Sequence, residues 1–441
     1  MDLSTLSQYD KPVPRYTSYP TAPKFASIEE SLFLSHLQRV KEPLSIYIHI
    51  PFCRSMCLFC GCSVILNRSE ARQANYVAYL LQEISRVGEE MGARKLCSQL
   101  HLGGGTPTSL TEEQFDLLMG RLREFFELKG EIAIEVDPRT VFADGGKKLE
   151  HLRKLGFNRV SFGVQDLDEK VQEAVKRRQS KEMSHRTLEM ARALGFSGIN
   201  LDLIYGLPHQ TVASFRKTAE EIALWRPDRI ALFSYAKVPH LKAHQKAIPE
   251  EALPSTEEKF QIYLEARRIF LEAGYVPIGM DHFALPEDSL AIALEQGKLG
   301  RNFQGYTVEA GEDLIPFGVS SIGSIDGNYF QNVKTLEEYT ARLDVARLPV
   351  YRGLIVSEED RLRRWVIQRL MCRFAVDKRA FEAEFGVSFD VHFARELERI
   401  DPELAINERD CLRATPFGQL LIRLVASTFD AHLHAEGSRA I

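Results

Sequence analysis

The chain has 441 residues, 44% hydrophobic and 27% charged, which is typical of a soluble globular protein and excludes an intrinsically disordered one. Lys and Arg (56) nearly balance Asp and Glu (61), and the formal charge of −5 argues against a nucleic-acid or anionic-membrane binder. No apolar run approaches the ~20 residues that span a bilayer, and no secretory signal precedes the first strand, so we expect a cytoplasmic protein with no membrane partner.

Short β-rich runs alternate with helix-like stretches over the first two thirds of the chain. The predicted strands are Ser45–Ile50, Ser98–Thr106, Glu131–Pro138, Arg159–Gln165, Gly198–Leu207 and Arg229–Ala236. The predicted helices are Arg68–Gly92, Thr111–Phe126, Lys147–Leu155, Glu169–Lys176, Ser184–Leu194, Ala213–Trp225 and Ser255–Ala273. In the second of these helices, Thr111 and Gln114 have the spacing of a capping box.

Strands rich in Val, Ile and Leu that alternate with helices predict a parallel sheet buried on both faces. Six such units form either an open doubly wound sheet or an incomplete barrel, and in both the functional residues gather at the carboxyl ends of the strands. The polar residues that stand out do follow the strands: Cys53–Cys62, Gly103–Thr106, Glu135, Gln165, Asp202 and Ala236. This shared position predicts one functional site.

Three parts of the chain are expected from these patterns. Residues 1–40 form a leading segment, and residues 41–335 form the β/α domain, in which residues 276–330 are expected to be polar-aromatic loops. From about Leu336 the pattern turns helical and charged, so we expect residues 336–441 to form a smaller α-rich domain.

Cysteine is the most informative residue type. Four of the seven cysteines lie within ten residues, at Cys53, Cys57, Cys60 and Cys62, which argues against a disulfide framework. Cys53-x3-Cys57-x2-Cys60 on a loop after the first strand suits three irons of a cubane cluster, with the fourth iron open to a further ligand. Zinc usually takes four ligands in two separated pairs, and no second pair exists here. A zinc-binding or merely buried cysteine group is the alternative.

The segment YIHIPFCRSMCLFCGC (Tyr47–Cys62) resembles the radical S-adenosylmethionine (SAM) superfamily, and more narrowly the oxygen-independent coproporphyrinogen III oxidase (coproporphyrinogen dehydrogenase) family. The cysteine motif alone indicates the superfamily, whereas PRYTSYP, RNFQGY and the ending Cys60-Gly61-Cys62 indicate the narrower family. The resembling motifs are PRYTSYPTA (Pro14–Ala22), HLGGGTPT (His101–Thr108), IEVDPR (Ile134–Arg139), GVQD (Gly163–Asp166), DLIYGLP (Asp202–Pro208), IGMDHFA (Ile278–Ala284) and RNFQGYT (Arg301–Thr307).

The resemblance implies an α/β fold, an incomplete (β/α)6 radical SAM barrel with an N-terminal cover segment and a smaller α-rich C-terminal domain. It also implies a [4Fe–4S] cluster on Cys53, Cys57 and Cys60, and two SAM molecules. One electron from the cluster would cleave the cluster-bound SAM to methionine and a 5′-deoxyadenosyl radical. Cys62 matches a non-ligand position close to the cluster that is needed for activity; a small buried filler is the alternative.

The positions that match contacts of the cluster-bound SAM are Tyr47, Gly104, Glu135 and Ile322. The positions that match contacts of the second SAM are Phe59, Gly105, Thr106, Gln165, Arg177, Asp202 and Ala236. Glycine allows a close backbone approach to a ligand, although a plain tight turn explains the glycines as well. Glu135 and Asp202 end apolar strands, where an unpaired carboxylate is costly; a ligand or a buried Arg would satisfy them.

The implied reaction converts the ring A and ring B propionates of coproporphyrinogen III to vinyl groups, giving protoporphyrinogen IX in anaerobic haem biosynthesis. An external electron donor and acceptor are needed, and a monomer is expected. The substrate carries four propionate carboxylates, and guanidinium groups are suited to bind them. Arg15 and Arg301 are therefore candidates for substrate binding, with surface solvation as the alternative. Gln304 is a candidate for positioning SAM or substrate, and Pro14–Ala22 for covering the site. The candidate catalytic residues are Cys62, Tyr47, Gln304, Arg15 and Arg301.

Two other functions remain open from the sequence. A haem chaperone or haem-trafficking relative typically carries Phe where Cys62 stands and lacks PRYTSYP and RNFQGY. A radical SAM methyltransferase that degrades haem is related in the core of the chain.

Overall fold

The computed structural model describes residues 8–9, 11–308 and 313–433. The chain divides into two compact units. The barrel unit comprises Ala26–Ala273 and Glu312–Ile355, and the terminal unit comprises Met1–Phe25, Gly274–Gly311 and Val356–Ile441. This division follows contacts rather than chain order, so the domain limits expected from the sequence stay predictions.

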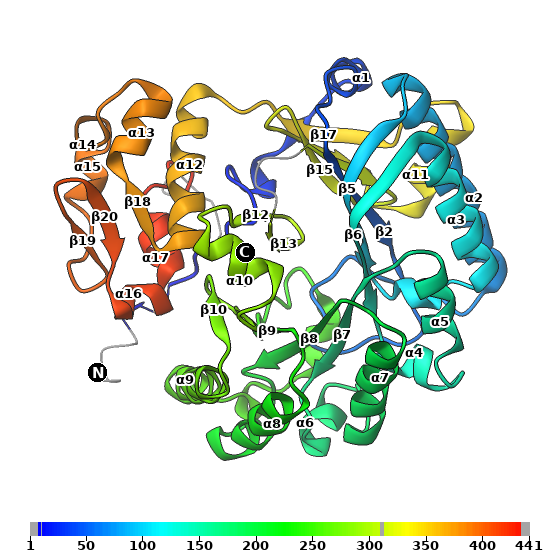
Figure 1. Ribbon diagram of the computed structural model, residues 1–441, viewed down its shortest axis with the longest axis horizontal. Coiled ribbons are helices and arrows are strands. Elements are labelled where there is room, and N and C mark those ends of the chain that lie inside the picture. Colours follow the sequence, from blue (N-terminus) through cyan, green and yellow to red (C-terminus); the bar gives the residue numbers. More distant parts are fainter. Residues whose placement is uncertain (1–7, 10, 309–312, 434–441) are drawn as a thin grey trace. The chain divides into compact units, whose positions relative to one another are not determined.

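Six parallel strands form the centre of the barrel unit, in the same order in the sheet as in the chain (Figure 1). They are β2 (Leu44–Ile50), β5 (Lys95–Gly104), β6 (Phe126–Val136), β7 (Arg159–Gln165), β8 (Gly198–Tyr205) and β9 (Arg229–Ser234). Parallel strands in this order place their carboxyl ends along one edge of the sheet. The predicted α/β fold with a (β/α)6 arrangement is confirmed.

Helices follow these strands and bury an apolar face. They are α2 (Glu70–Met91), α3 (Glu112–Phe125), α4 (Pro138–Phe142), α5 (Lys147–Lys154), α6 (Glu169–Ala174), α7 (Lys181–Ala193), α8 (Val212–Trp225) and α9 (Thr256–Glu272). The predicted capping box at Thr111 and Gln114 is present, since each side chain bonds the other residue's backbone N–H. The sequence therefore locates seven of these helices to within a few residues, whereas the short helix α4 was not predicted.

Four more strands extend the sheet beyond β2, in the order β14, β15, β16 and β17 (Figure 1). They are β14 (Leu314–Phe317), β15 (Ile322–Ile325), β16 (Asn328–Asn332) and β17 (Val350–Leu354), joined by α11 (Leu336–Asp344). β14 is parallel to β2, and the others are antiparallel to their neighbours. The sequence predicted loops up to residue 330, so β14 and β15 were missed because these strands are short. The remaining elements of this unit are β1 (Ala26–Ser27), α1 (Glu30–Leu37), β3 (Phe52–Cys53) and β4 (Ile65–Leu66).

The terminal unit combines helices with small antiparallel sheets. Its helices are α10 (Ser289–Glu295), α12 (Glu358–Arg373), α13 (Lys378–Phe385), α14 (Phe389–His392), α15 (Ala394–Leu397), α16 (Pro416–Leu420) and α17 (Ile422–Ser427). Its strands are β10 (Val276–Ile278), β11 (His282–Ala284), β12 (Gly300–Asn302), β13 (Gly305–Thr307), β18 (Ala375–Asp377), β19 (Ala405–Asn407) and β20 (Cys411–Ala414). The expected α-rich character holds, with the sheet β18-β20-β19 as an addition that the sequence pattern did not indicate.

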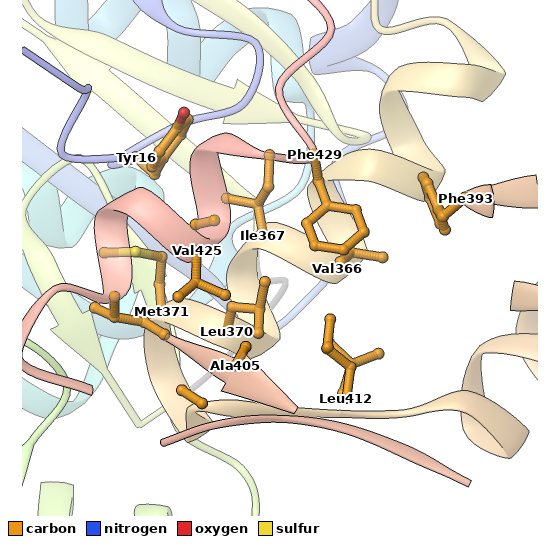
Figure 2. Packing of buried hydrophobic residues seen from close by; sticks show 14 of the residues in the cluster. Tyr16, Val366, Ile367, Leu370, Met371, Phe393, Ala405, Leu412, Val425 and Phe429 are labelled. Carbon is orange, nitrogen blue, oxygen red and sulfur yellow. The ribbon is translucent and has the colours of Figure 1, made fainter. Parts of the chain in front are cut away.

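The N-terminal segment packs into the core of this terminal unit (Figure 2). Tyr16 and Tyr19 are buried, at 3% and 1% exposed. The hydroxyl of Tyr16 donates to Oδ2 of Asp430 at 3.0 Å, and that of Tyr19 accepts from the N–H of Ala431 at 3.0 Å. These contacts exclude a bare flexible leader for the described part of this segment; covering the site stays a prediction.

Candidate functional site

The cysteine-bearing loop follows β2 and is fixed by other parts of the barrel unit. Three side chains in and next to the short 3-10 helix Ala243–Ala247 donate hydrogen bonds to carbonyl groups of the cysteine-bearing loop. Gln245 donates to the carbonyl of Phe59 at 2.9 Å, His244 to that of Cys60 at 2.8 Å and Lys242 to that of Cys62 at 2.6 Å. The loop therefore has a defined shape that the chain's own residues maintain.

The four thiols of this loop lie in different electrostatic surroundings. Burial raises the pKa of Cys53 to about 11, partly offset by the Thr106 hydroxyl, which is 3.4 Å from its sulfur. A hydrogen bond from the Cys62 thiol lowers the pKa of Cys60, and the positive charges of Lys242 and His244 act in the same direction. The same bond raises the pKa of Cys62, a residue that is exposed as a whole. Cys60 is thus the more acidic thiol of this pair.

The donor set fits an iron–sulfur cluster better than a single metal ion. In the described part of the chain, no group of three or more His, Cys, Asp or Glu side chains is arranged to hold one metal ion. In a cubane cluster each cysteine binds its own iron, so the three sulfurs need not converge on one point. Three cysteines on one loop, Cys53, Cys57 and Cys60, form a donor set of this kind.

A cluster of polar side chains spans the first three strands beside this loop. In the sheet register, Tyr47 on β2 is the neighbour of His101 on β5, and their rings stack at 5.9 Å. The Tyr47 hydroxyl lies 3.0 Å from Nδ1 of His49. His101 lies 3.3 Å from Oε1 of Glu135 on β6, and the N–H of Gly104 donates to Oε2 at 3.0 Å. These residues form one hydrogen-bonded layer.

The hydrogen bonds of this layer determine whether Glu135 is ionised. Burial alone would raise its pKa, but the hydrogen bonds from His101 and from the Gly104 N–H outweigh burial and lower the pKa below its ordinary value. Glu135 is therefore ionised at neutral pH and has a carboxylate ready for a cationic ligand. The predicted alternative of a buried Arg partner does not apply, because His101 and a backbone N–H take that place.

The glycine turn at the end of β5 is required by the chain's own packing. A Cβ on Gly103 would lie 2.7 Å from Oε1 of Glu135, and one on Gly104, whose φ is +111°, would lie 2.4 Å from the ring of His49. On Gly105 it would lie 2.7 Å from the carbonyl oxygen of Pro51. The turn thus lies directly against the start of the cysteine loop and the carboxylate, and contact of Gly104 and Gly105 with SAM stays a prediction.

The next strands, β7 and β8, and the segment between α6 and α7 carry polar atoms that have no partner within the described residues. These are Oε1 of Gln165, Nε of Arg177 and Oδ1 of Asn200, all buried. Burying such atoms without a hydrogen bond is costly unless a ligand supplies one. Asp202 adds a carboxyl group whose pKa burial raises to about 7, with the charge of Glu135 acting in the same direction. This polar interior fits a nucleoside–amino-acid ligand such as SAM.

The other predicted contact residues lie at the same edge of the sheet or beside the loop. Thr106 follows β5, Ala236 follows β9, and the Ala236 carbonyl accepts from Gln245 at 3.2 Å. Ile322 begins β15, whose neighbour β14 pairs with β2. Phe59 packs against an apolar cluster that contains Leu58, Val171, Val175, Leu207, Tyr235 and Ile248. All predicted SAM-contact residues therefore belong to the barrel unit.

The predicted substrate residues belong to the terminal unit and form their own cluster. Arg15 pairs with the buried Asp281, which also bonds Nδ1 of His282 at 2.7 Å. Although burial opposes it, Arg15 holds the pKa of Asp281 well below its usual range. Arg301 donates to the carbonyl of Arg15 at 3.3 Å and lies over the Tyr306 ring at 4.6 Å. Arg15 is thus committed to an internal ion pair.

Arg301 and Gln304 keep unused hydrogen-bonding atoms. Nε and Nη1 of Arg301 and Oε1 of Gln304 are buried and have no hydrogen-bond partner among the described residues. Arg301 itself is only 7% exposed. A buried guanidinium with spare donors is a strong attraction for a carboxylate.

Several residues of the site were missed from the sequence. His49 and His101 were not singled out, although the alternation of strand residues places His49 on the same face as Tyr47. Asp281 was noted only within a motif. The three residues that bond the cysteine-bearing loop, Lys242, His244 and Gln245, follow β9 in or next to the 3-10 helix. No sequence signal indicated a role for them.

Comparison with known proteins agrees with this geometry. Residues 47–222 match the Radical SAM superfamily, and residues 356–421 match the HemN C-terminal domain. The oxygen-independent coproporphyrinogen III oxidase of Salmonella typhimurium is 43% identical over 441 residues, which cover 98% of this chain and 95% of the relative. The enzyme of that name from Synechocystis is 41% identical over 444 residues, covering 97% and 94%.

A solved structure has the same fold. It is described as coproporphyrinogen III oxidase (HemN) from Escherichia coli, a radical SAM enzyme; the TM-score is 0.91, the identity is 41%, and the match covers 96% of this chain and 100% of that one. The fold and the site thus define a radical SAM enzyme. Within that class, the chain belongs to the oxygen-independent coproporphyrinogen III oxidase family. No helix in the described ranges is long and apolar enough to cross a membrane.

Proposed function

We propose that this chain converts coproporphyrinogen III to protoporphyrinogen IX in anaerobic haem biosynthesis. The ring A and ring B propionates each lose one β-hydrogen, one electron and carbon dioxide and become vinyl groups. The observation that carries this proposal is the 43% identity, over 98% of the chain, to a curated oxygen-independent coproporphyrinogen III oxidase. The presence of Cys62, PRYTSYP and RNFQGY favours this function over haem trafficking.

The cysteine loop and the strand ends hold the cofactors in this proposal. Cys53, Cys57 and Cys60 bind the [4Fe–4S] cluster. When bound, the cluster and SAM supply a 5′-deoxyadenosyl radical through one-electron cleavage of SAM. Glu135 accepts a hydrogen bond from the SAM ammonium, a role for which its lowered pKa prepares it. Tyr47, Gly104 and Ile322 line the same SAM.

A second SAM is proposed near the carboxyl ends of β7 and β8, further along the sheet from the cluster-bound SAM. Its support is the unsatisfied buried atoms of Gln165 and Arg177 and the buried carboxyl group of Asp202. These groups are suited to hydrogen-bond the carboxylate, the amino group and a sugar hydroxyl of SAM. The remaining residues proposed for this SAM are Phe59, Gly105, Thr106 and Ala236.

In the terminal unit, Arg301 is proposed as the anchor for a substrate propionate. Its spare donors support this role, whereas Arg15 is paired with Asp281 and positions Arg301 through its carbonyl group. Gln304 orients the substrate or SAM beside it. Tyr47 and Cys62 act next to the cluster, where the thiol of Cys62 donates to Cys60.

The remaining partners follow from the reaction and the family. We propose an external electron donor to reduce the cluster, an external acceptor for the electron released with each carbon dioxide, a monomeric protein and a cytoplasmic location.

An anaerobic assay tests the function. The reconstituted protein is incubated with coproporphyrinogen III, SAM and a reductant, and the product is oxidised and measured as protoporphyrin. Protoporphyrin formation at the expense of SAM is the expected result. Stoichiometric haem binding without protoporphyrin would instead identify a haem chaperone, and SAM-dependent loss of added haem would identify the haem-degrading methyltransferase.

A further inference from the structure

Cys57 differs from the other cysteines of the loop because guanidinium groups lie beside its sulfur. Nη1 of Arg177 is 3.5 Å from the Cys57 sulfur, while Nη2 donates to the carbonyl of Gly163 at 2.6 Å. Arg177 is buried, at 7% exposed. By contrast, the Cys53 sulfur lies beside the neutral hydroxyl of Thr106. The guanidinium charges of the loop's surroundings therefore lie at Cys57, whereas Lys242 and His244 lie beside Cys60.

Asp137 holds two guanidinium groups in this place. Arg139 binds it with two donors, Nε to Oδ1 at 3.0 Å and Nη2 to Oδ2 at 2.6 Å. Nη1 of Arg177 lies 3.6 Å from the same Oδ2. The positive charge of Arg139 also interacts electrostatically with Cys57. Two positive charges and one negative charge leave a net positive charge at Cys57.

This charge matters for a cluster bound by Cys57. A [4Fe–4S] cluster gains one negative charge when it takes up an electron, and hydrogen bonds to its sulfurs and nearby positive charges stabilise that reduced form. The effect is large where water is scarce, since charges interact more strongly at low dielectric constant. A buried guanidinium at a ligand sulfur therefore favours reduction.

We propose that Arg177 and Arg139, balanced by Asp137, raise the reduction potential of the cluster through Cys57. The inference rests on the proposed function, which supplies the cluster. It gives Arg177 a role toward the cluster in addition to its proposed contact with the second SAM. Asp137 and Arg139 become positioning residues that set how much positive charge reaches the sulfur.

The test is a redox titration of the anaerobically reconstituted protein without SAM, with the reduced cluster measured by electron paramagnetic resonance. Arg177→Gln and Arg139→Gln are expected to shift the midpoint potential to more negative values. Asp137→Asn is expected to shift it to more positive values, because it removes the compensating charge while an Asn can still cap α4. Arg177→Lys, which keeps the charge but loses the planar fork, is expected to lie between Arg177→Gln and the unchanged protein.

Arg178→Gln is the matched control. It removes one guanidinium at the adjacent position, but Arg178 is exposed and pairs with Glu173 at 2.6 Å. Its midpoint potential is expected to equal that of the unchanged protein. Iron content and visible absorption are measured first, so that only variants with a full cluster are compared.

The outcomes separate the two proposals. If Arg139→Gln and Asp137→Asn hold a full cluster and titrate at the same potential as Arg178→Gln, the inference is wrong while the proposed function stands. If the unchanged protein assembles no cluster, the proposed function itself fails. Should Arg177→Gln lose its cluster, the opposite shifts expected for the other two variants still decide the matter.

Discussion

His101 and Glu135 lie on adjacent parallel strands, with Nε2 of the histidine 3.3 Å from Oε1 of the carboxylate. The other carboxylate oxygen accepts the N–H of Gly104. Both oxygens are thus held from the same side of the site by neighbours in the sheet. This arrangement fixes the carboxylate in one orientation, which the turn of three glycines alone would not do.

Replacement of His101 tests this arrangement. His101→Phe keeps a ring to stack on Tyr47 but removes the donor to Glu135. A hydrogen bond to a charged group contributes roughly 1.5–3 kcal/mol, so SAM affinity is expected to fall roughly 10- to 100-fold. Equilibrium dialysis of SAM against the oxidised, reconstituted protein measures this without catalysis.

His101→Gln serves as the control because its amide group retains a donor. It is expected to recover most of the affinity lost in His101→Phe. Equal affinities for the unchanged protein and His101→Phe would contradict a role for His101 in SAM binding.

The cysteine assignment predicts which thiols are needed for iron. Cys53→Ser, Cys57→Ser and Cys60→Ser are each expected to abolish the brown colour and iron content obtained by anaerobic reconstitution with iron and sulfide. Cys411→Ser, far from the loop in the sequence, is expected to retain both. A variant of the first three that kept full iron would remove that residue from the ligand set.

Arg301 is predicted to bind a substrate carboxylate. Arg301→Ala is expected to weaken binding of coproporphyrin III, an air-stable tetracarboxylate, by at least roughly 30-fold, because truncating a buried charge partner costs about 2 kcal/mol or more. Fluorescence titration of the porphyrin measures the affinity. Arg301→Lys is expected to recover only part of it, since Lys lacks the planar fork.

SAM cleavage gives the second readout for this variant. Reductive cleavage of SAM in the absence of substrate is expected to stay near the unchanged rate in Arg301→Ala. A parallel loss of SAM cleavage and porphyrin binding would reject a substrate role. Arg15→Ala is expected to have a smaller effect on porphyrin affinity than Arg301→Ala, because Arg15 is paired with Asp281.

Glu83 is predicted to make the stability of the barrel unit pH-dependent. This buried residue of α2 accepts hydrogen bonds from the Gly318 N–H at 2.8 Å, from Asn332 at 2.6 Å and from Tyr339. Burial nevertheless raises its pKa from 4.5 to about 7. The folded protein therefore binds a proton at Glu83 at a pH where the unfolded chain has released it.

The sign of the effect follows from this raised pKa. The stabilisation is fully present below pH 4.5 and is lost as the pH rises through about 7. Its upper limit is roughly 3 kcal/mol, at about 1.4 kcal/mol per pKa unit. Glu83→Gln cannot titrate, so the melting temperature of the unchanged protein is expected to fall relative to that of Glu83→Gln between pH 5 and pH 8.

Differential scanning calorimetry at several pH values measures this difference. Glu150→Gln, on the exposed surface of α5, is the control and is expected to show no change in relative stability over this range. A constant difference between the unchanged protein and Glu83→Gln would show that Glu83 does not titrate there.

The six central strands and the helices between them were predictable because apolar runs and helix caps are local signals. The capping box at Thr111 and Gln114 was read directly from four consecutive positions. β14 to β17 were not predictable in the same way, since strands of four or five residues carry little periodicity. β14 in addition pairs with β2, which lies more than 250 residues earlier in the chain.

The candidate site divides along the same line. The motifs around Cys53 and Gly104 could be recognised from the sequence, because closely spaced cysteines and consecutive glycines form a distinctive local pattern. The roles of His101 and Asp281 were not visible, because each depends on a partner that only the sheet register or the packing of a distant segment supplies.

The sequence by itself determined the chemistry available to this protein: three cysteines at one spacing, a glycine turn, and motifs that place the chain in one family. Only the tertiary structure decided which charges are used. It paired Arg15 with Asp281 and left donors of Arg301 without a partner among the described residues, and it placed Asp137 between Arg139 and Arg177 beside Cys57. Hydrogen bonds and charge interactions depend on distances of a few ångströms between residues far apart in the chain, and these distances are set by packing rather than by spacing in the sequence.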